Sequence, residues 1–246
     1  MFGPAGKGMA QGMATMASAL TIYGRREWIA CSAVSAALLG VIGVLAWSHM
    51  PWLAAAAPVL ALWGWAMWFF RDPDRLVPEE PGVFVSSADG VVADITPVGP
   101  GEALGVEGTR IGVFMNIFNV HVNRAPCDAQ VVSVDHQSGV FLDVRKPEAA
   151  FRNESATIRL NVTHAGRQHP VLVRQVAGLV ARRIVTDLSP GRQVRRGQRI
   201  GMIKFGSRLE LWLPAELVGE VRVAVGDPAL AGQTVLAAAP KEPANA

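Results

Sequence analysis

The pair Gly206-Ser207 lies between two apolar runs near the end of the chain and could carry covalent chemistry. Glycine leaves its own carbonyl carbon unshielded and lets the backbone adopt strained angles. The hydroxyl of Ser207 could then attack the carbonyl carbon of Gly206 and convert the amide into an ester. A lone Gly-Ser pair is more often an ordinary turn, so this pattern alone leaves both interpretations open.

Two further side chains have the types that acid–base chemistry needs. His121 lies between two valines, and a pKa near the working pH would let it both accept and deliver a proton. Asp89 lies in Ala-Asp-Gly, and a carboxylate can orient an imidazole. Taken alone, an Asp-Gly pair is typical of a hairpin turn, and a histidine between valines is typical of a structural position.

The segments around these residues resemble the short-form phosphatidylserine decarboxylases, a family that includes archaetidylserine decarboxylase-like enzymes. The resemblance spans about residues 65–237 and rests on Phe69-Phe-Arg-Asp-Pro-Asp-Arg75, Ser87-Ala-Asp-Gly90, Phe114-Met-Asn-Ile-Phe-Asn-Val-His-Val-Asn-Arg-Ala-Pro126, Asn153-Glu154, Gln175–Val185, Gly197–Arg208 and Leu211-Trp-Leu-Pro214. These motifs follow the family's order. Because several separate motifs agree, chance does not account for the match.

The resemblance implies a proenzyme that cuts itself between Gly206 and Ser207. The products would be a β chain of residues 1–206 and an α chain of residues 207–246, which remain together as a heterodimer; a higher oligomer is left open. Ser207 would become a covalent pyruvoyl group, so the implied cofactor is pyruvate. In the family, the amine of phosphatidylserine forms a Schiff base with this ketone, and loss of carbon dioxide gives phosphatidylethanolamine. The implied activity is that of a carboxy-lyase.

The resemblance also assigns roles to single residues. Asp89 resembles the aspartate that orients a histidine during self-cleavage, and His121 resembles the active-site histidine. Longer relatives carry a second histidine three residues later, where this chain has Arg124. His121 is then the candidate base in this motif, although the sequence leaves open which base drives self-cleavage. Arg124 could hold the lipid phosphate or the serine carboxylate in a bidentate fork.

Two long apolar segments precede most of these motifs. Trp28–Trp47 and Trp52–Phe70 carry no charge, and about 20 such residues in a helix span a hydrocarbon core of ~30 Å. The short link between them predicts an α-helical hairpin at residues 25–71, either transmembrane or embedded in one leaflet. Basic residues flank both ends and none lies in the link. The positive-inside rule therefore predicts a catalytic domain on the cytoplasmic face of the cell (plasma) membrane.

The rest of the chain has the composition of a water-soluble domain. Half of all residues are hydrophobic and the mean hydropathy is +0.28, but the excess lies before Arg71. Short strand-like segments bounded by glycine, proline or aspartate predict a mainly β catalytic domain over residues 72–240. The repeat of Gly191–Ile200 in Gly226–Val235 is typical of the sandwich-like barrel of biotinyl and lipoyl domains. Residues 1–24 are expected to form a flexible segment without a motif.

Other interpretations of the chain stay open at this stage. A non-enzymatic, membrane-tethered β-sandwich adaptor would explain the hairpin, the repeat and the basic cluster between Arg182 and Arg208, but not Gly206-Ser207. A pyruvoyl decarboxylase could also act on another serine phospholipid, such as an ether-linked archaeal lipid, or on a soluble amino acid, against which the hairpin argues. Two distant cysteines support neither a disulfide nor a metal site. We expect phosphatidylserine and the lipid bilayer as partners, and no nucleic acid.

Overall fold

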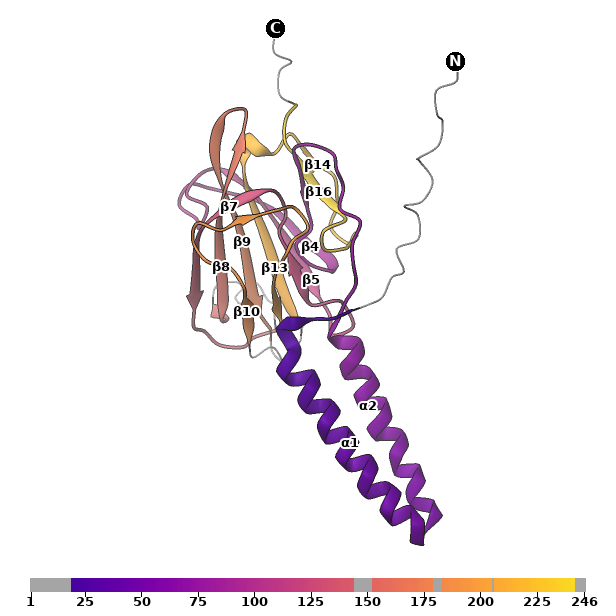
Figure 1. The fold of residues 1–246 in the computed structure, drawn as a ribbon. Helices are drawn as coiled ribbons and strands as arrows, with labels where there is room; N and C mark the ends of the chain where they lie inside the picture. The colour runs from indigo at the N-terminus through magenta and orange to yellow at the C-terminus, as the bar shows by residue number, and fades with distance from the viewer. Residues whose placement is uncertain (1–18, 144–151, 179–182, 205, 242–246) are drawn as a thin grey trace, which may run out of the picture.

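A computed structural model describes residues 19–143, 152–178, 183–204 and 206–241. It consists of a helical hairpin that projects from one end of a β domain (Figure 1). Most of the segment predicted to be flexible, up to residue 18, lies outside the described residues. Its described end forms the short strand β1 (Ala19–Leu20) and a 3-10 turn (Ile22–Gly24). Strand β1 pairs with β2 (Arg71–Asp72), which directly follows the hairpin, at the end where the hairpin joins the β domain (Figure 1).

The hairpin contains α1 (Arg25–Ser48), a 3-10 helix (Met50–Ala55) and α2 (Ala56–Phe69). The sequence had predicted an α-helix for the whole second apolar segment. This prediction is wrong for the start of that segment, which is a 3-10 helix. Pro51 lies in the first turn of the 3-10 helix, and Pro58 has no N–H to offer the carbonyl four residues earlier, so regular α-helical bonding begins only after it.

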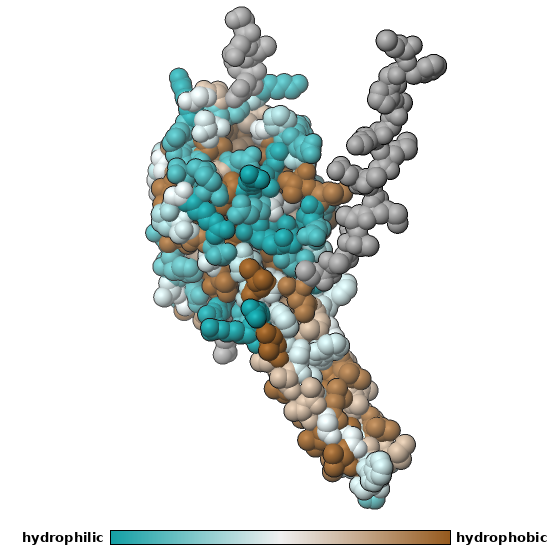
Figure 2. All heavy atoms as spheres, in the orientation of Figure 1, coloured by the Kyte–Doolittle hydropathy of each residue, from teal (hydrophilic) through white to brown (hydrophobic). Residues whose placement is uncertain are grey.

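The outer surface of the hairpin is apolar. Two spans, Ile22–Ser48 and Met50–Phe69, are long and apolar enough to cross a membrane. Figure 2 shows hydrophobic side chains along both helices and mostly hydrophilic ones over the β domain. Trp47, at the distal end, is 95% exposed. Such a surface is costly in water and suits a lipid environment.

A curled, antiparallel sheet of eight strands forms the body of the β domain, in the order β11-β7-β8-β9-β13-β5-β4-β15. Its strands are β4 (Gly90–Val98), β5 (Gly108–Met115), β7 (Ala129–Gln137), β8 (Ser155–His164), β9 (Arg167–Ala177), β11 (Gln193–Val194), β13 (Ser207–Pro214) and β15 (Pro228–Ala229). Ile158, Val173, Leu211 and Ile111 lie side by side across four strands and are completely buried. This row is part of the main hydrophobic core.

Two three-stranded sheets complete the domain. One has the order β10-β12-β6 and the other β14-β16-β3. Their strands are β3 (Val83–Val85), β6 (Val122–Arg124), β10 (Ile184–Thr186), β12 (Arg199–Ile203), β14 (Glu220–Val221) and β16 (Val235–Ala238). The prediction of a mainly β domain preceded by a helical hairpin is confirmed.

The internal repeat of the sequence is also a repeat of the structure. All four of its glycines have a positive φ, which favours glycine: Gly191, Gly197, Gly226 and Gly232. In the two units, the first glycine donates its N–H at 2.8 Å to Val131 of β7 and to Val92 of β4, respectively. The following strands β11 and β15 pair with the same two partners. The two units therefore occupy opposite edges of the large sheet.

Candidate active site

Ser207 is the first residue of β13, in the middle of the large sheet. It pairs with Met115 of β5 on one side and with Ala177 of β9 on the other. The residue is completely buried, and its hydroxyl lies 3.9 Å from the sulfur of Met115. A thioether is only a weak acceptor. The hydroxyl is therefore shielded from bulk water, and among the described residues it has no strong acceptor.

Gly206 adopts a backbone conformation that favours glycine. Its φ is +53°, in the left-handed region. A Cβ added to it would meet no atom within 4 Å. The preference for glycine is thus conformational, because no atom of the described residues, apart from the chain neighbours, lies where a Cβ would be. The positive φ agrees with the need for glycine at this position that the Gly-Ser pair suggested.

His121 lies close to the segment that leads into this bond. It directly precedes β6, which pairs with β12, and β12 ends at Ile203. The N–H of Ile203 approaches the carbonyl oxygen of His121 at 3.4 Å. Strand pairing therefore places His121 next to Ile203, three residues before Gly206, although His121 and Gly206 are far apart in sequence.

The imidazole of His121 is arranged as a neutral base. Its Nδ1 lies 2.9 Å from the carbonyl oxygen of Asn119. A carbonyl only accepts, so Nδ1 carries the proton and Nε2 keeps a free lone pair. Nε2 is buried and has no hydrogen-bond partner among the residues that the structure describes. Burial lowers the pKa of His121 to about 4, against the opposing effect of the Asn119 carbonyl.

This pKa differs from the value near the working pH that the sequence suggested. The reason is desolvation, because the ring is completely buried and packs against a phenylalanine. His121 is thus neutral at physiological pH, which suits a proton acceptor. Delivery of a proton requires a change in its surroundings.

The phenylalanine is Phe69, the last residue of α2. Its ring centroid lies 4.5 Å from that of His121, and the side chain is completely buried. Next to it, Arg71 donates to the carbonyl of Phe118 at 2.7 Å and lies over the ring of Trp68 at 4.1 Å. The end of the hairpin therefore contacts both the histidine and the loop before it. Sequence reasoning had not selected Phe69, although it begins one of the quoted motifs.

Three polar side chains, two of them buried and one half-buried, form a chain of hydrogen bonds near the serine. Gln175 donates to Asn123 at 2.8 Å and accepts from the hydroxyl of Thr186 at 2.9 Å. Asn123 also approaches the sulfur of Met115 at 3.9 Å, the atom that Ser207 contacts. Sequence reasoning missed this network. A polar residue within an apolar strand was the available signal, because such a residue needs a partner when buried.

Asp89 is held by groups other than His121. One carboxylate oxygen accepts the N–H of Ala231 at 2.8 Å and the other forms a salt bridge with Arg75 at 2.7 Å. Burial raises the pKa of Asp89, and Arg75 opposes that shift. No hydrogen bond in the described part of the chain joins Asp89 to His121. The orienting role of Asp89 in self-cleavage stays a prediction.

Arg124 is also occupied by protein groups. Its guanidinium donates to Asp72 at 3.1 Å, to the carbonyl of Pro73 at 2.9 Å and to the carbonyl of Gly197 at 3.0 Å. Only 7% of its side chain is exposed. Substrate binding by Arg124 stays a prediction, and it requires the guanidinium to leave Asp72.

The site fits a prosthetic group made from the chain itself. Across the described residues, no group of three or more histidine, cysteine, aspartate or glutamate side chains could hold a metal ion. By contrast, a buried serine hydroxyl follows a glycine of positive φ, and the unpartnered nitrogen of a neutral histidine lies near the approach to it. These are the parts that an N-to-O acyl shift needs: a nucleophile, a glycine amide next to it and a base.

Comparison with known proteins places these residues in a family context. A family model described as phosphatidylserine decarboxylase matches residues 62–237. A phosphatidylserine decarboxylase proenzyme of Paramagnetospirillum magneticum is 41% identical over 218 residues, covering 87% of this chain and 85% of the relative. One of Geobacter sulfurreducens is 42% identical over 210 residues, covering 85% and 93%. One of Ruegeria pomeroyi is 41% identical over 204 residues, covering 82% and 89%.

Proposed function

The chain belongs to the phosphatidylserine decarboxylase family, and we propose that it converts phosphatidylserine into phosphatidylethanolamine and carbon dioxide after cutting itself. Relatives named as proenzymes of this activity align with most of this chain, and the alignments also include most of each relative. The observation that carries the proposal is the buried hydroxyl of Ser207 next to Gly206, whose φ is positive.

Self-cleavage needs one base and one unshielded carbonyl. Nε2 of His121 accepts the hydroxyl proton while the oxygen of Ser207 attacks the carbonyl carbon of Gly206. The C–N bond breaks, an ester forms, and the freed nitrogen takes the proton. Removal of the α-proton of residue 207 then breaks the bond between Cβ and the ester oxygen. This step releases the carboxylate of Gly206 and leaves dehydroalanine, which water converts to a ketone with loss of ammonia.

In the mature enzyme, the pyruvoyl group would supply a ketone for the lipid amine and a sink for the electrons that carbon dioxide leaves behind. His121 would then hold the proton for the substrate's α carbon. An incoming anionic substrate favours the charged imidazolium and raises the pKa of His121 from its low value. The same residue would thus serve as base before cleavage and as acid afterwards.

The sheet explains how the two chains would stay together. After cleavage, β13 would begin the α chain, while its neighbours β5 and β9 belong to the β chain. The new chain end is therefore hydrogen-bonded on both sides to the other chain. Separation would expose the buried row around Leu211 to water, which favours a lasting heterodimer.

The hairpin supports a location at the cell membrane, with the β domain on the cytoplasmic face. Arg25 and Arg26 begin α1, and Arg71 and Arg75 follow α2. The link between the helices carries no lysine or arginine. This distribution is typical of a hairpin whose two ends lie in the cytoplasm.

Intact-mass spectrometry of the protein purified in detergent tests self-cleavage. We expect two masses, for residues 1–206 and for residues 207–246 with a pyruvoyl end in place of serine. Ser207→Ala should remain one chain and release no carbon dioxide from vesicles that contain phosphatidylserine. Ser189→Ala, at an exposed loop position, is the control and should mature normally. A cleaved Ser207→Ala protein would end the pyruvoyl proposal.

A further inference from the structure

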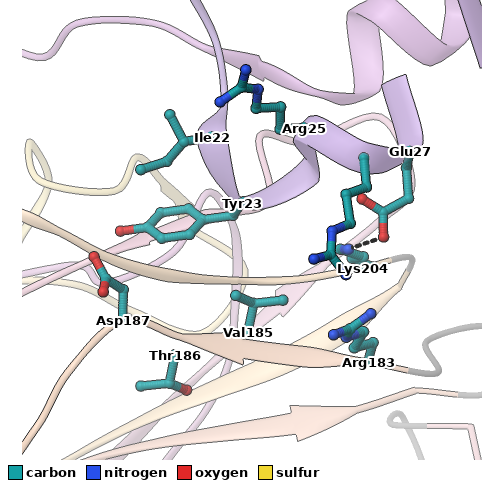
Figure 3. Close-up of a pocket in the computed structure, with 10 residues that line it drawn as sticks. Ile22, Tyr23, Arg25, Glu27, Arg183, Val185, Thr186, Asp187 and Lys204 are labelled. Carbon is teal, nitrogen blue, oxygen red and sulfur yellow. Dashed lines mark hydrogen bonds and ion pairs between the residues drawn. The ribbon is translucent and has the colours of Figure 1, made fainter. Parts of the chain in front are cut away.

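A cavity lies where the start of α1 meets strand β10 and Lys204, the residue after β12. Its volume is about 540 Å³, and six of the ten residues that line it are charged: Arg25, Arg26, Glu27, Arg183, Asp187 and Lys204. Figure 3 shows Glu27, Lys204 and Arg183 on one side of this cavity, with Tyr23 and Asp187 on the other. It lies at the first residues of the span Ile22–Ser48, so it is at the level where the β domain would meet the membrane.

The charges around this cavity are not balanced. Lys204 forms an ion pair with Glu27, and Asp187 forms one with Arg192 at 3.7 Å. Both carboxylates therefore already have a cationic partner. The remaining three cations, Arg25, Arg26 and Arg183, are exposed and make no side-chain hydrogen bond or ion pair with any residue in the described ranges. Guanidinium groups without a direct ion-pair partner attract an anion.

We propose that this cavity binds the phosphate of an anionic membrane phospholipid other than the molecule that is being decarboxylated. Guanidinium groups bind phosphate through paired, charge-assisted hydrogen bonds. Ile22 lines the same cavity and is 71% exposed, which offers an apolar surface to the glycerol and acyl part of a lipid. The anionic surface of the cytoplasmic leaflet supplies such lipids next to basic residues at the membrane boundary.

The cavity is separate from the site of cleavage. Neither Ser207 nor His121 lines it. Ser207 is buried between β5 and β9, whereas the cavity is bounded by residues of β10, by Lys204 after β12, and by the start of α1. A lipid held here would therefore leave the amine-binding position free. It would fix the β domain against the bilayer at the segment that leads to Gly206.

Native mass spectrometry of the full chain in dodecylmaltoside tests this site. The Ser207→Ala protein is used, so that the result does not depend on self-cleavage, with either phosphatidylglycerol or phosphatidylcholine added to the micelles. We expect one phosphatidylglycerol to be retained and phosphatidylcholine to be lost. The double variant Arg26→Ala, Arg183→Ala should lower the affinity for phosphatidylglycerol roughly 10-fold or more, since hydrogen bonds to charged groups contribute most to such binding.

The control is Arg167→Ala, at the start of β9 and outside the lining of the cavity. It should retain phosphatidylglycerol as the parent does, and circular dichroism should show that all variants are folded. Equal retention by the double variant, or equal retention of phosphatidylcholine, would overturn the proposal. Inorganic phosphate in excess separates the sources: displacement of the lipid at comparable concentrations would indicate a site for free phosphate instead. Failure of self-cleavage in the parent would leave this measurement unaffected.

Discussion

Asp89 and Asp128 occupy equivalent positions in the two halves of the β domain. The carboxylate of Asp89 accepts the N–H of Ala231, and that of Asp128 accepts the N–H of Arg196, both at 2.8 Å. Each bond fixes the turn of one repeat unit. Asp89 differs because it is buried and also forms a salt bridge with Arg75. Asp128 therefore serves as a control: a property of Asp89 that Asp128 lacks is not explained by holding the turn.

Asp89→Asn should slow self-cleavage by roughly 10-fold or more, while Asp128→Asn matures at the parental rate. Asparagine keeps an oxygen that can accept the backbone N–H but removes the charge, and carboxylates that assist a catalytic imidazole have effects of up to ~10⁴-fold. Denaturing gels after pulse labelling measure the rate. Decarboxylation by the fraction of Asp89→Asn that has matured should stay close to parental. Equal maturation of the two variants would limit Asp89 to its role in the turn.

The low pKa of His121 predicts the pH dependence of self-cleavage. The base acts unprotonated, so its active form predominates above the pKa of about 4 and is lost as the pH falls through it. Newly synthesised precursor should therefore mature at a constant rate between about pH 5.5 and 8, whereas an ordinary histidine would lose activity below pH ~6.5. Within this pH range, His121→Ala should slow maturation by about 10²–10⁴-fold.

The lowered pKa of His121 also makes the stability of the folded precursor depend on pH, so the pH experiment needs a control for folding. A folded-state pKa below the unfolded value means that the stability from neutral His121 is complete above pH ~6.5 and decreases as the pH falls towards 4. Circular dichroism at each pH must therefore show a folded precursor. A fall in maturation centred near pH 6.5 in folded protein would contradict the buried, neutral imidazole.

Phe69→Leu should move the pH midpoint of maturation upwards, towards the ordinary pKa of histidine. The smaller side chain leaves the imidazole of His121 more hydrated, and desolvation is the main cause of its low pKa. Phe70→Leu is the matched control, because Phe70 packs on Phe69 with ring centroids 5.0 Å apart. It should lower stability without moving the midpoint. Identical pH profiles for the two variants would show that Phe69, and with it the hairpin, does not set the pKa of His121.

Arg124→Met should destabilise the fold more than it weakens substrate binding. Removing one partner of a buried ion pair typically costs about 3–5 kcal/mol, and both Arg124 and Asp72 have side chains that are only 7% exposed. Arg199→Met is the control, since Arg199 pairs with the same Asp72 but is 37% exposed. Urea unfolding and the KM for phosphatidylserine vesicles are compared. A large rise in KM at unchanged stability would establish Arg124 as a substrate ligand.

The sequence alone determined the helical hairpin and the class of fold, and it gave the prediction of a cut between Gly206 and Ser207. Long uncharged runs have few stable arrangements other than helices in lipid, so Trp28–Trp47 was recognisable from its residues. Gly206-Ser207 was predicted as the cleavage site because the segments around it resemble a known family, since a Gly-Ser pair alone is more often a turn. The repeated Gly-Gln turns predicted the β architecture, since a positive φ at Gly197 and Gly232 is a local requirement.

Only the tertiary structure decided what the charges do. The basic residues that cluster in the sequence are separated by folding: Arg199 pairs with Asp72, Arg208 bonds to Asp94 at 2.8 Å, and Arg183 faces the cavity at the start of α1. Such partners are far apart along the chain, so no local pattern shows which charge will be paired. The pKa of His121 likewise depends on burial against Phe69, because desolvation arises only when distant elements pack together.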